Sequence, residues 1–139
     1  MRGGRVDGQS ERQFKRTPAS VGKARAFVQA ALPIEQARHR IDDIVLCVSE
    51  LATNAVEHGT PAGHLFFVRV IFNETLLCVE VHDADNGRLC LKSPSDEDLS
   101  GRGLFLVDAL SDGWGIMPRD GLGKVVWAEF KLPTTRALS

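Results

Sequence analysis

The hydrophobic pattern of this sequence changes its period near residue 60, and that change most limits the folds open to the chain. Before it, apolar residues recur at three- and four-residue steps in two segments, 17–32 and roughly 40–58, as they do in amphipathic helices. After it come two strand-like runs, His64–Phe72 and Leu76–Asp83, whose short polar junction predicts an antiparallel hairpin. Helices followed by hairpin-linked strands predict a two-layer α+β sandwich.

The ends of these segments carry ordinary stop and start signals. Thr17-Pro18 is typical of a helix start and Pro33 of a helix end, while Gly59 and Pro61 close the second helix. Beyond the hairpin, residues 84–100 form a polar stretch rich in Asp, Asn, Ser and Pro. The remaining pattern predicts a helix over 103–110, a short strand near 114–117 and a last strand over 124–132.

Length and charge narrow the class of protein. The 139 residues fit one domain, here 17–133, with 1–16 and 134–139 expected to be flexible tails. The formal net charge of −1 gives no reason to expect nucleic acid. No run approaches the roughly 18 apolar residues of a membrane span. Three cysteines without a C-x-x-C spacing predict a reducing, cytoplasmic location.

Glu50 and Asn54 are the first candidate site residues. They lie four residues apart on the second helix and therefore share one polar face, opposite the apolar one. The simpler interpretation is a solvated helix face. The functional one is a carboxylate and an amide oxygen directed into a cleft, which is the pairing needed to hold Mg²⁺ and position a nucleophile.

Asp83 is the second candidate. It continues the core-facing phase of Leu77, Val79 and Val81, and a buried carboxylate without donors costs several kcal/mol. Asp83 either caps the following loop or accepts a hydrogen bond from a ligand amine inside the fold.

The third candidate is the glycine pair of Ser100-Gly101-Arg102-Gly103-Leu104, which opens a helix. Small residues at a helix N-terminus let backbone N–H groups approach an anion, although such a pair is often only a tight turn. Leu106 stands where a Rossmann fingerprint would need its third glycine, so that fingerprint is excluded.

The order of these three features resembles the GHKL (histidine kinase-like) ATPase superfamily, and within it the serine-kinase anti-sigma factors of bacteria. The resemblance covers nearly everything from residue 17 to 133. Its matching segments are SELATNAVEHG (49–59), VEVHDADNG (79–87), SGRGLFLVDALSDGWG (100–115) and GKVVWAEF (123–130).

The resemblance implies a Bergerat-type sandwich, with helices on one face of a mixed, mostly antiparallel sheet, that binds ATP and Mg²⁺. It makes Glu50 the general base, Asn54 the Mg²⁺ ligand and Asp83 the acceptor for the adenine amino group. Gly87 falls in the adenine motif, residues 84–100 form the nucleotide lid, and the segment that meets the phosphates is Gly101, Arg102, Gly103 and Leu104. The implied activity is a protein serine/threonine kinase that phosphorylates a small antagonist protein and sequesters a sigma factor. The resemblance also suggests a homodimer.

Two positions depart from the family's pattern. Asp85 replaces the first glycine of a full Asp-x-Gly-x-Gly adenine motif, and Val125 stands about where many relatives carry a threonine near the adenine. These departures favour an alternative, in which a protein of the same fold with a degenerate nucleotide site regulates its partners by contact alone.

Overall fold

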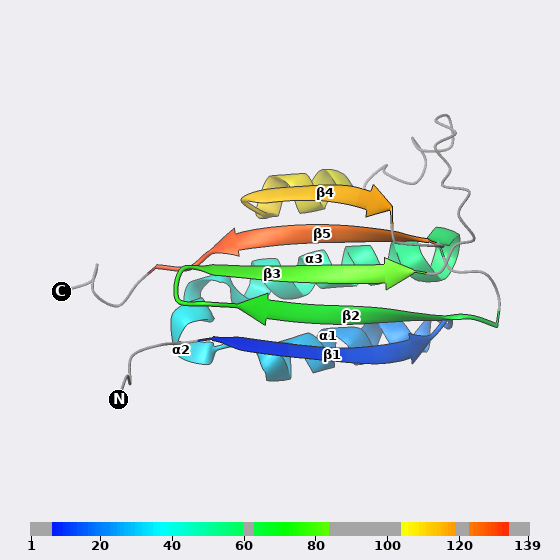
Figure 1. Ribbon diagram of the computed structural model, residues 1–139, viewed down its shortest axis with the longest axis horizontal. Coiled ribbons are helices and arrows are strands. Elements are labelled where there is room, and N and C mark those ends of the chain that lie inside the picture. Colours follow the sequence, from blue (N-terminus) through cyan, green and yellow to red (C-terminus); the bar gives the residue numbers. More distant parts are fainter. Residues whose placement is uncertain (1–6, 60–62, 84–103, 119–122, 134–139) are drawn as a thin grey trace.

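The sheet contains five antiparallel strands, and its order brings segments distant in sequence together. In the computed structural model, which describes residues 7–59, 63–83, 104–118 and 123–133, the strand order is β1-β2-β3-β5-β4 (Figure 1). Every neighbouring pair among the described residues is antiparallel. The strands are β1 (Gly8–Lys15), β2 (Leu65–Phe72), β3 (Leu76–Asp83), β4 (Gly113–Pro118) and β5 (Lys124–Lys131).

The helices lie on one face of this sheet, with α1 and α3 in contact (Figure 1). Residues 104–110 are also helical and lie beside β4. None of the helices in the described ranges is long and apolar enough to cross a membrane. The other helical elements are α1 (Ala19–Ala31), α2 (Ile34–Ala37), the 3₁₀ turn η1 (Arg38–Arg40), α3 (Ile41–Asn54) and the π turn η2 (Ala55–Gly59).

The core forms between the helices and the alternate residues of the central strands. On β3, every second residue from Leu77 is buried, and α3 turns its apolar stripe, including Ile44 and Leu51, toward the sheet. Fully burying one such side chain contributes about 1.5 to 3 kcal/mol. The predicted α+β sandwich and its central hairpin are therefore confirmed, and the sheet is wholly antiparallel in the described part.

The N-terminal region corrects the expectation of a flexible tail over residues 1–16. Residues 8–15 form the edge strand β1, in register with β2 from Gly8↔Phe72 to Lys15↔Leu65. Phe14 anchors this strand, because its ring stacks on Phe66 with 5.6 Å between ring centroids. Residues 1–6, the predicted lid over 84–100 and the tail 134–139 lie outside the described residues.

The second predicted helix, roughly 40–58, is confirmed, but its last turn has a different geometry from the rest. It begins at Ile41, after the short α2 and η1 that the sequence did not reveal, and its α-helical part ends at Asn54. The chain then continues as the π turn η2, which ends at the expected Gly59. A π turn is rare and often occurs at functional sites, which draws attention to this end of the fold.

Candidate functional site

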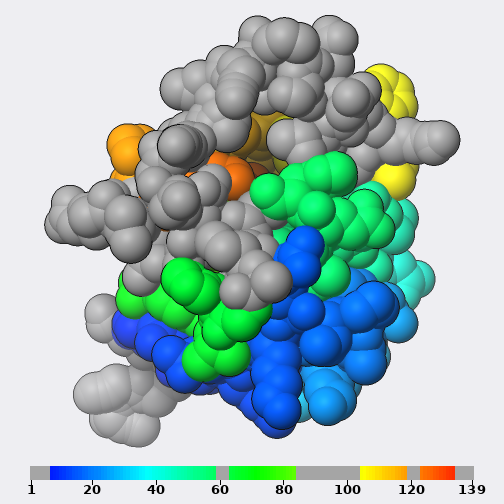
Figure 2. All heavy atoms as spheres, turned by 90° about the vertical axis from the view of Figure 1, so that its right-hand side faces the viewer, coloured from blue at the N-terminus to red at the C-terminus, as the bar shows by residue number. Residues whose placement is uncertain are grey.

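A cavity of about 50 Å³ lies where β3 ends, β5 begins and α3 passes into η2. Figure 2 views the molecule from this end, where the green C-terminal end of α3 lies beside the blue start of α1. The cavity walls come from five segments of the chain: Leu51, Asn54, Ala55 and His58 from α3 and η2; Val81 and Asp83 from β3; Leu104; Ile116 from β4; and Lys124 and Val126 from β5.

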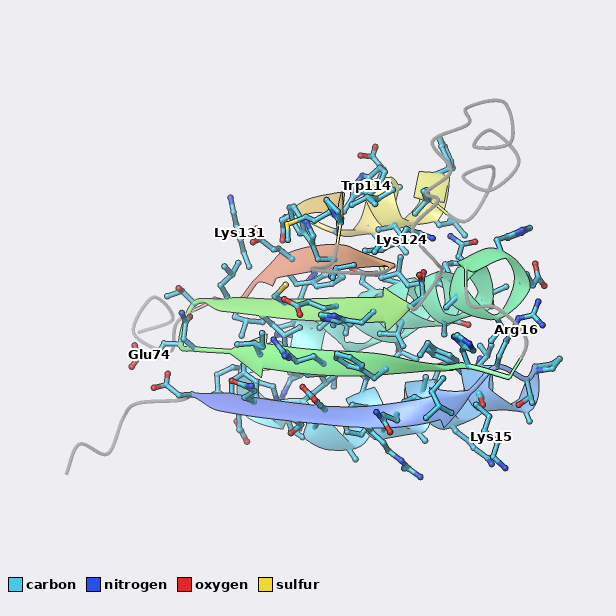
Figure 3. The ribbon with its side chains drawn as sticks, turned by 45° about the vertical axis from the view of Figure 1, so that its right-hand side comes forward. Lys15, Arg16, Glu74, Trp114, Lys124 and Lys131 are labelled. Atoms are coloured by element: carbon cyan, nitrogen blue, oxygen red, sulfur yellow. The ribbon has the colours of Figure 1, made fainter. Side chains whose placement is uncertain are left out.

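Strand register sets the polar side of the cavity. Asp83 is the last residue of β3 and Lys124 the first of β5, and the two are direct cross-strand partners. Both occupy the core-facing phase of their strands, so they meet at the edge of the core. The Lys124 Nζ lies 3.1 Å from Asp83 Oδ2 (Figure 3 labels Lys124).

Asp83 is almost completely buried, with 2% of its surface exposed, and only 19% of the Lys124 side chain is exposed. Moving a carboxylate away from water is costly, and a lysine ammonium at hydrogen-bond distance offsets part of that cost. The sequence predicts that a buried Asp83 carboxylate needs donor groups around it, and Lys124 supplies one of them.

The helix above the cavity contributes its own polar groups at the change from α to π geometry. Asn54 is the last α-helical residue and is half-buried, and His58 follows in η2 with an exposed side chain. The N–H of Ala55 donates to the carbonyls of both Ala52 and Leu51, a shared hydrogen bond of the kind that is common at the end of an α-helix. Both Asn54 and His58 line the cavity.

Glu50 lies one turn before Asn54 on α3, half-buried, and is not one of the residues that line the cavity. Its neighbour Ser49 accepts a hydrogen bond from Arg25 of α1 at 3.1 Å. The structure thus brings Asn54, Asp83 and Leu104 together. Glu50 does not line the cavity, although its neighbour Leu51 does and Asn54 lies one helical turn further on. Gly87, Gly101, Arg102 and Gly103 lie outside the described residues, as does Asp85.

Val125 does not line the cavity, although its sequence position suggested a place near the adenine. It is in register with His82, whereas its neighbours Lys124 and Val126 face the cavity. Since successive residues of a strand point to opposite faces, Val125 lies on the sheet face away from the cavity. The aliphatic residue of β5 that lines the cavity is Val126.

Lys124 is the site residue that sequence reasoning missed, although a signal was present. In the predicted strand 124–132, Lys124 shares its phase with Val126, Ala128 and Phe130, which form a core-facing row. A lysine at the start of a core-facing row needs an acidic partner, just as Asp83 at the end of one needs a donor.

The two described cysteines do not supply a nucleophile. Burial raises the pKa of Cys47 to about 12, with a further contribution from nearby Asp43, and burial followed by the charge of Glu80 raises that of Cys78 to about 12. Both thiols therefore stay protonated near neutral pH, and the thiolate is the reactive form. The chemistry of the described site consists of a carboxylate, an amide, an ammonium and an imidazole around one apolar cavity.

Comparison with known proteins adds one finding. The family model described as "Histidine kinase-like ATPase domain" matches residues 14–130, from the end of β1 almost to the end of β5. No curated protein matches the chain. The matched range contains every residue that lines the cavity.

Proposed function

The chain belongs to the histidine kinase-like ATPase domain family, and from that premise we propose that it binds ATP with Mg²⁺ at the cavity between α3, β3 and β5. The observation that carries the proposal is the meeting of Asn54, Asp83 and Leu104 at one cavity, although they come from separate parts of the sequence. A carboxylate can accept a hydrogen bond from the adenine amino group. An amide oxygen is a ligand of the type that Mg²⁺ prefers.

Each residue has a distinct part in this proposal. Asp83 accepts a hydrogen bond from the adenine amino group, and the Asn54 side-chain oxygen holds Mg²⁺. Gly101, Arg102, Gly103 and Leu104 meet the phosphates, and Gly87 belongs to the adenine-binding motif. When bound, Mg·ATP supplies the transferable phosphoryl group, while the protein supplies positioning and charge stabilisation.

We further propose that the chain is a serine/threonine protein kinase-like anti-sigma regulator of the cytoplasm, which phosphorylates an antagonist protein and sequesters a sigma factor. In this proposal Glu50 is the general base that takes the proton of the acceptor hydroxyl. Support comes from the position of Glu50, which is half-buried, adjacent to the cavity-lining Leu51 and one helical turn before Asn54. A general base must lie within reach of the proton that it takes.

Titration of the full chain with ATP, with and without Mg²⁺, tests the binding step. We expect saturable binding that Mg²⁺ strengthens, and Asn54→Ala is expected to remove most of that Mg²⁺ effect. Loss of a residue that only supports a metal ligand typically costs about 10- to 100-fold in metal affinity, and loss of the ligand itself is expected to cost at least as much. No binding by the wild type at millimolar ATP would contradict the proposal.

A phosphoryl-transfer assay with a candidate antagonist tests the kinase step. Glu50→Ala is expected to lower transfer by about 10²-fold or more while leaving ATP affinity nearly unchanged, because the base acts only during transfer. Glu74→Ala provides a matched control, since Glu74 is an exposed carboxylate of the β2–β3 turn, at the other end of the sheet from Lys124 (Figure 3).

The Asp83–Lys124 ion pair gives one specific reason to keep the second candidate function. The Asp83 carboxylate is already paired with an ammonium, so its hydrogen bond to an adenine amino group is weaker. A regulator of the same fold that acts by contact alone does not need that hydrogen bond. This alternative predicts that Glu50→Ala leaves regulation of the partners intact, whereas substitutions in the partner-binding surface abolish it.

A further inference from the structure

Lys124 lines the cavity beside Asp83, the carboxylate that binds the adenine amino group in the proposed function. Its Nζ lies 3.1 Å from Asp83 Oδ2, and the two residues are held opposite each other by the β3–β5 register. Both line the same cavity as Asn54 and Val126. The ion pair is therefore part of the candidate binding surface and not a separate surface contact.

The Asp83–Lys124 pair carries no net charge, whereas a lone carboxylate would be negative. The ammonium neutralises Asp83 and already donates to one of its oxygens, so a neutral amine that approaches it gains a weaker interaction. At the same time, an ammonium has three donors and a flexible four-carbon stem, so Lys124 can present a donor to the cavity next to the Asp83 acceptor.

We propose that Lys124 is a specificity-determining residue that makes the site accept purines with either an amino group or a carbonyl oxygen at C6. With the first, Asp83 accepts from the C6 amine and Lys124 donates to N1; with the second, Asp83 accepts from N1–H and Lys124 donates to the carbonyl oxygen. Because donor and acceptor are reversed along the edge of the base, the flexible Lys124 stem places its ammonium on the opposite side of the Asp83 carboxylate in the second case. The inference rests on the proposed nucleotide site.

If Lys124 has this role, the wild type binds purines with a C6 amine and with a C6 carbonyl oxygen with similar affinity. A variant without the lysine strongly prefers the C6 amine. A purine triphosphate that leaves a buried charged donor or acceptor without a partner loses about 10- to 100-fold in affinity. Lys124→Met removes the donor but keeps an unbranched side chain of similar length. The remaining carboxylate then has no complement for a C6 carbonyl oxygen and a stronger attraction for a C6 amine.

The experiment is a calorimetric titration of the full chain with Mg·ATP and Mg·ITP, which differ at C6 and in the protonation of N1. We expect the wild type to bind the two within about threefold of each other, and Lys124→Met to prefer ATP by at least about tenfold. Lys131→Met is the matched control, because Lys131 is exposed at the far end of the same strand (Figure 3), and it is expected to behave as the wild type.

The outcomes separate this inference from the proposed function. A wild type that binds ATP at least about 30-fold more tightly than ITP overturns the role of Lys124 and leaves ATP binding intact. Equal ratios in the wild type and a folded Lys124→Met variant do the same. If neither protein binds either nucleotide at millimolar concentration, the proposed function itself fails. Should Lys124→Met not fold, the wild-type ratio alone decides, and Lys124→Arg, which keeps the charge, is expected to retain that ratio.

Discussion

The two ends of strand β5 both carry charged clusters, but they are built in different ways. At the end near Lys131, the Arg40 guanidinium donates to the carbonyl of Leu110 at 2.8 Å and to the Asp112 carboxylate at 3.0 Å. The same guanidinium lies 5.3 Å from the centre of the Phe130 ring. We call these residues the Arg40 cluster: Arg40, Leu110, Asp112, Phe130 and Lys131.

At the other end, near Lys124, the charged groups face a cavity, whereas the Arg40 guanidinium binds backbone carbonyls of the fold. Asp83 and Lys124 form a buried ion pair there, and the amide of Asn54 and the imidazole of His58 border the same space. Figure 3 shows Lys124 and Lys131 at opposite ends of the strand.

The difference indicates which end is structural and which is available for a ligand. The Arg40 cluster satisfies its donors with groups of the fold itself, which joins the start of α3 to residues 110–112 and the end of β5. The cavity end keeps polar groups beside an open space, an arrangement that costs stability and is typical of binding sites.

The largest effect on stability is expected at the cavity end. Asp83→Ala leaves the mostly buried Lys124 ammonium without the carboxylate, and the free energy of unfolding should fall by about 2 to 3 kcal/mol. Urea denaturation measures this, and the double variant Asp83→Ala/Lys124→Met should lose less than the sum of its two single variants. Strict additivity would show that the pair does not interact energetically.

A smaller loss is expected when the Arg40 cluster is opened. Arg40→Met removes hydrogen bonds at the start of α3 and should lower the free energy of unfolding by about 2 kcal/mol. Arg40→Lys keeps the charge but not the planar fork, and is expected to restore less than half of that loss. Neither change should alter nucleotide affinity, so a tenfold loss of ATP binding in a folded Arg40 variant would break the contrast between the two ends.

The smallest effect concerns Asp112 and depends on pH. The N–H of Lys131 donates to Asp112 Oδ2 at 2.7 Å, and this bond, together with Arg40, lowers the pKa of Asp112 below its ordinary 3.8. A carboxyl whose pKa is lower in the folded state stabilises the fold above its unfolded pKa, and that stability is lost as the pH falls through the folded value.

Asp112→Asn is therefore expected to lower the free energy of unfolding by about 1 kcal/mol at pH 7, and the difference from the wild type should shrink below about pH 4. Urea denaturation of both proteins over a series of pH values measures it. A difference that stays constant down to about pH 2 would mean that the carboxylate charge contributes nothing to the cluster.

The sequence predicted the elements with a regular hydrophobic period and missed those without one. The β2–β3 hairpin and helix α3 are correct because alternate or helically spaced apolar residues fix which face is buried. Strand β1 has a single buried residue, Phe14, so its pairing with β2 leaves no pattern in the sequence. The π turn η2 was missed for the opposite reason: its residues continue the helical pattern of α3, so the hydrophobic spacing does not mark the change of geometry.

At the site, the sequence correctly placed Asp83 in the core-facing phase and Asn54 on α3, as the structure confirms. It did not pair Asp83 with Lys124, because cross-strand register between β3 and β5 depends on a connection of some 40 residues. The roles assigned to the site residues all remain predictions: those of Glu50, Asn54, Asp83, Gly87, Gly101, Arg102, Gly103 and Leu104.

The central claim, that the ligand binds at the cavity end and not at the Arg40 cluster, is tested most directly by NMR mapping of backbone amide shifts during a Mg·ATP titration. The account predicts saturable shifts around Asn54, His58, Asp83 and Lys124, while the amides of Arg40, Asp112 and Lys131 stay in place. Saturable shifts centred on the Arg40 cluster, or none around the cavity at millimolar ATP, would contradict it.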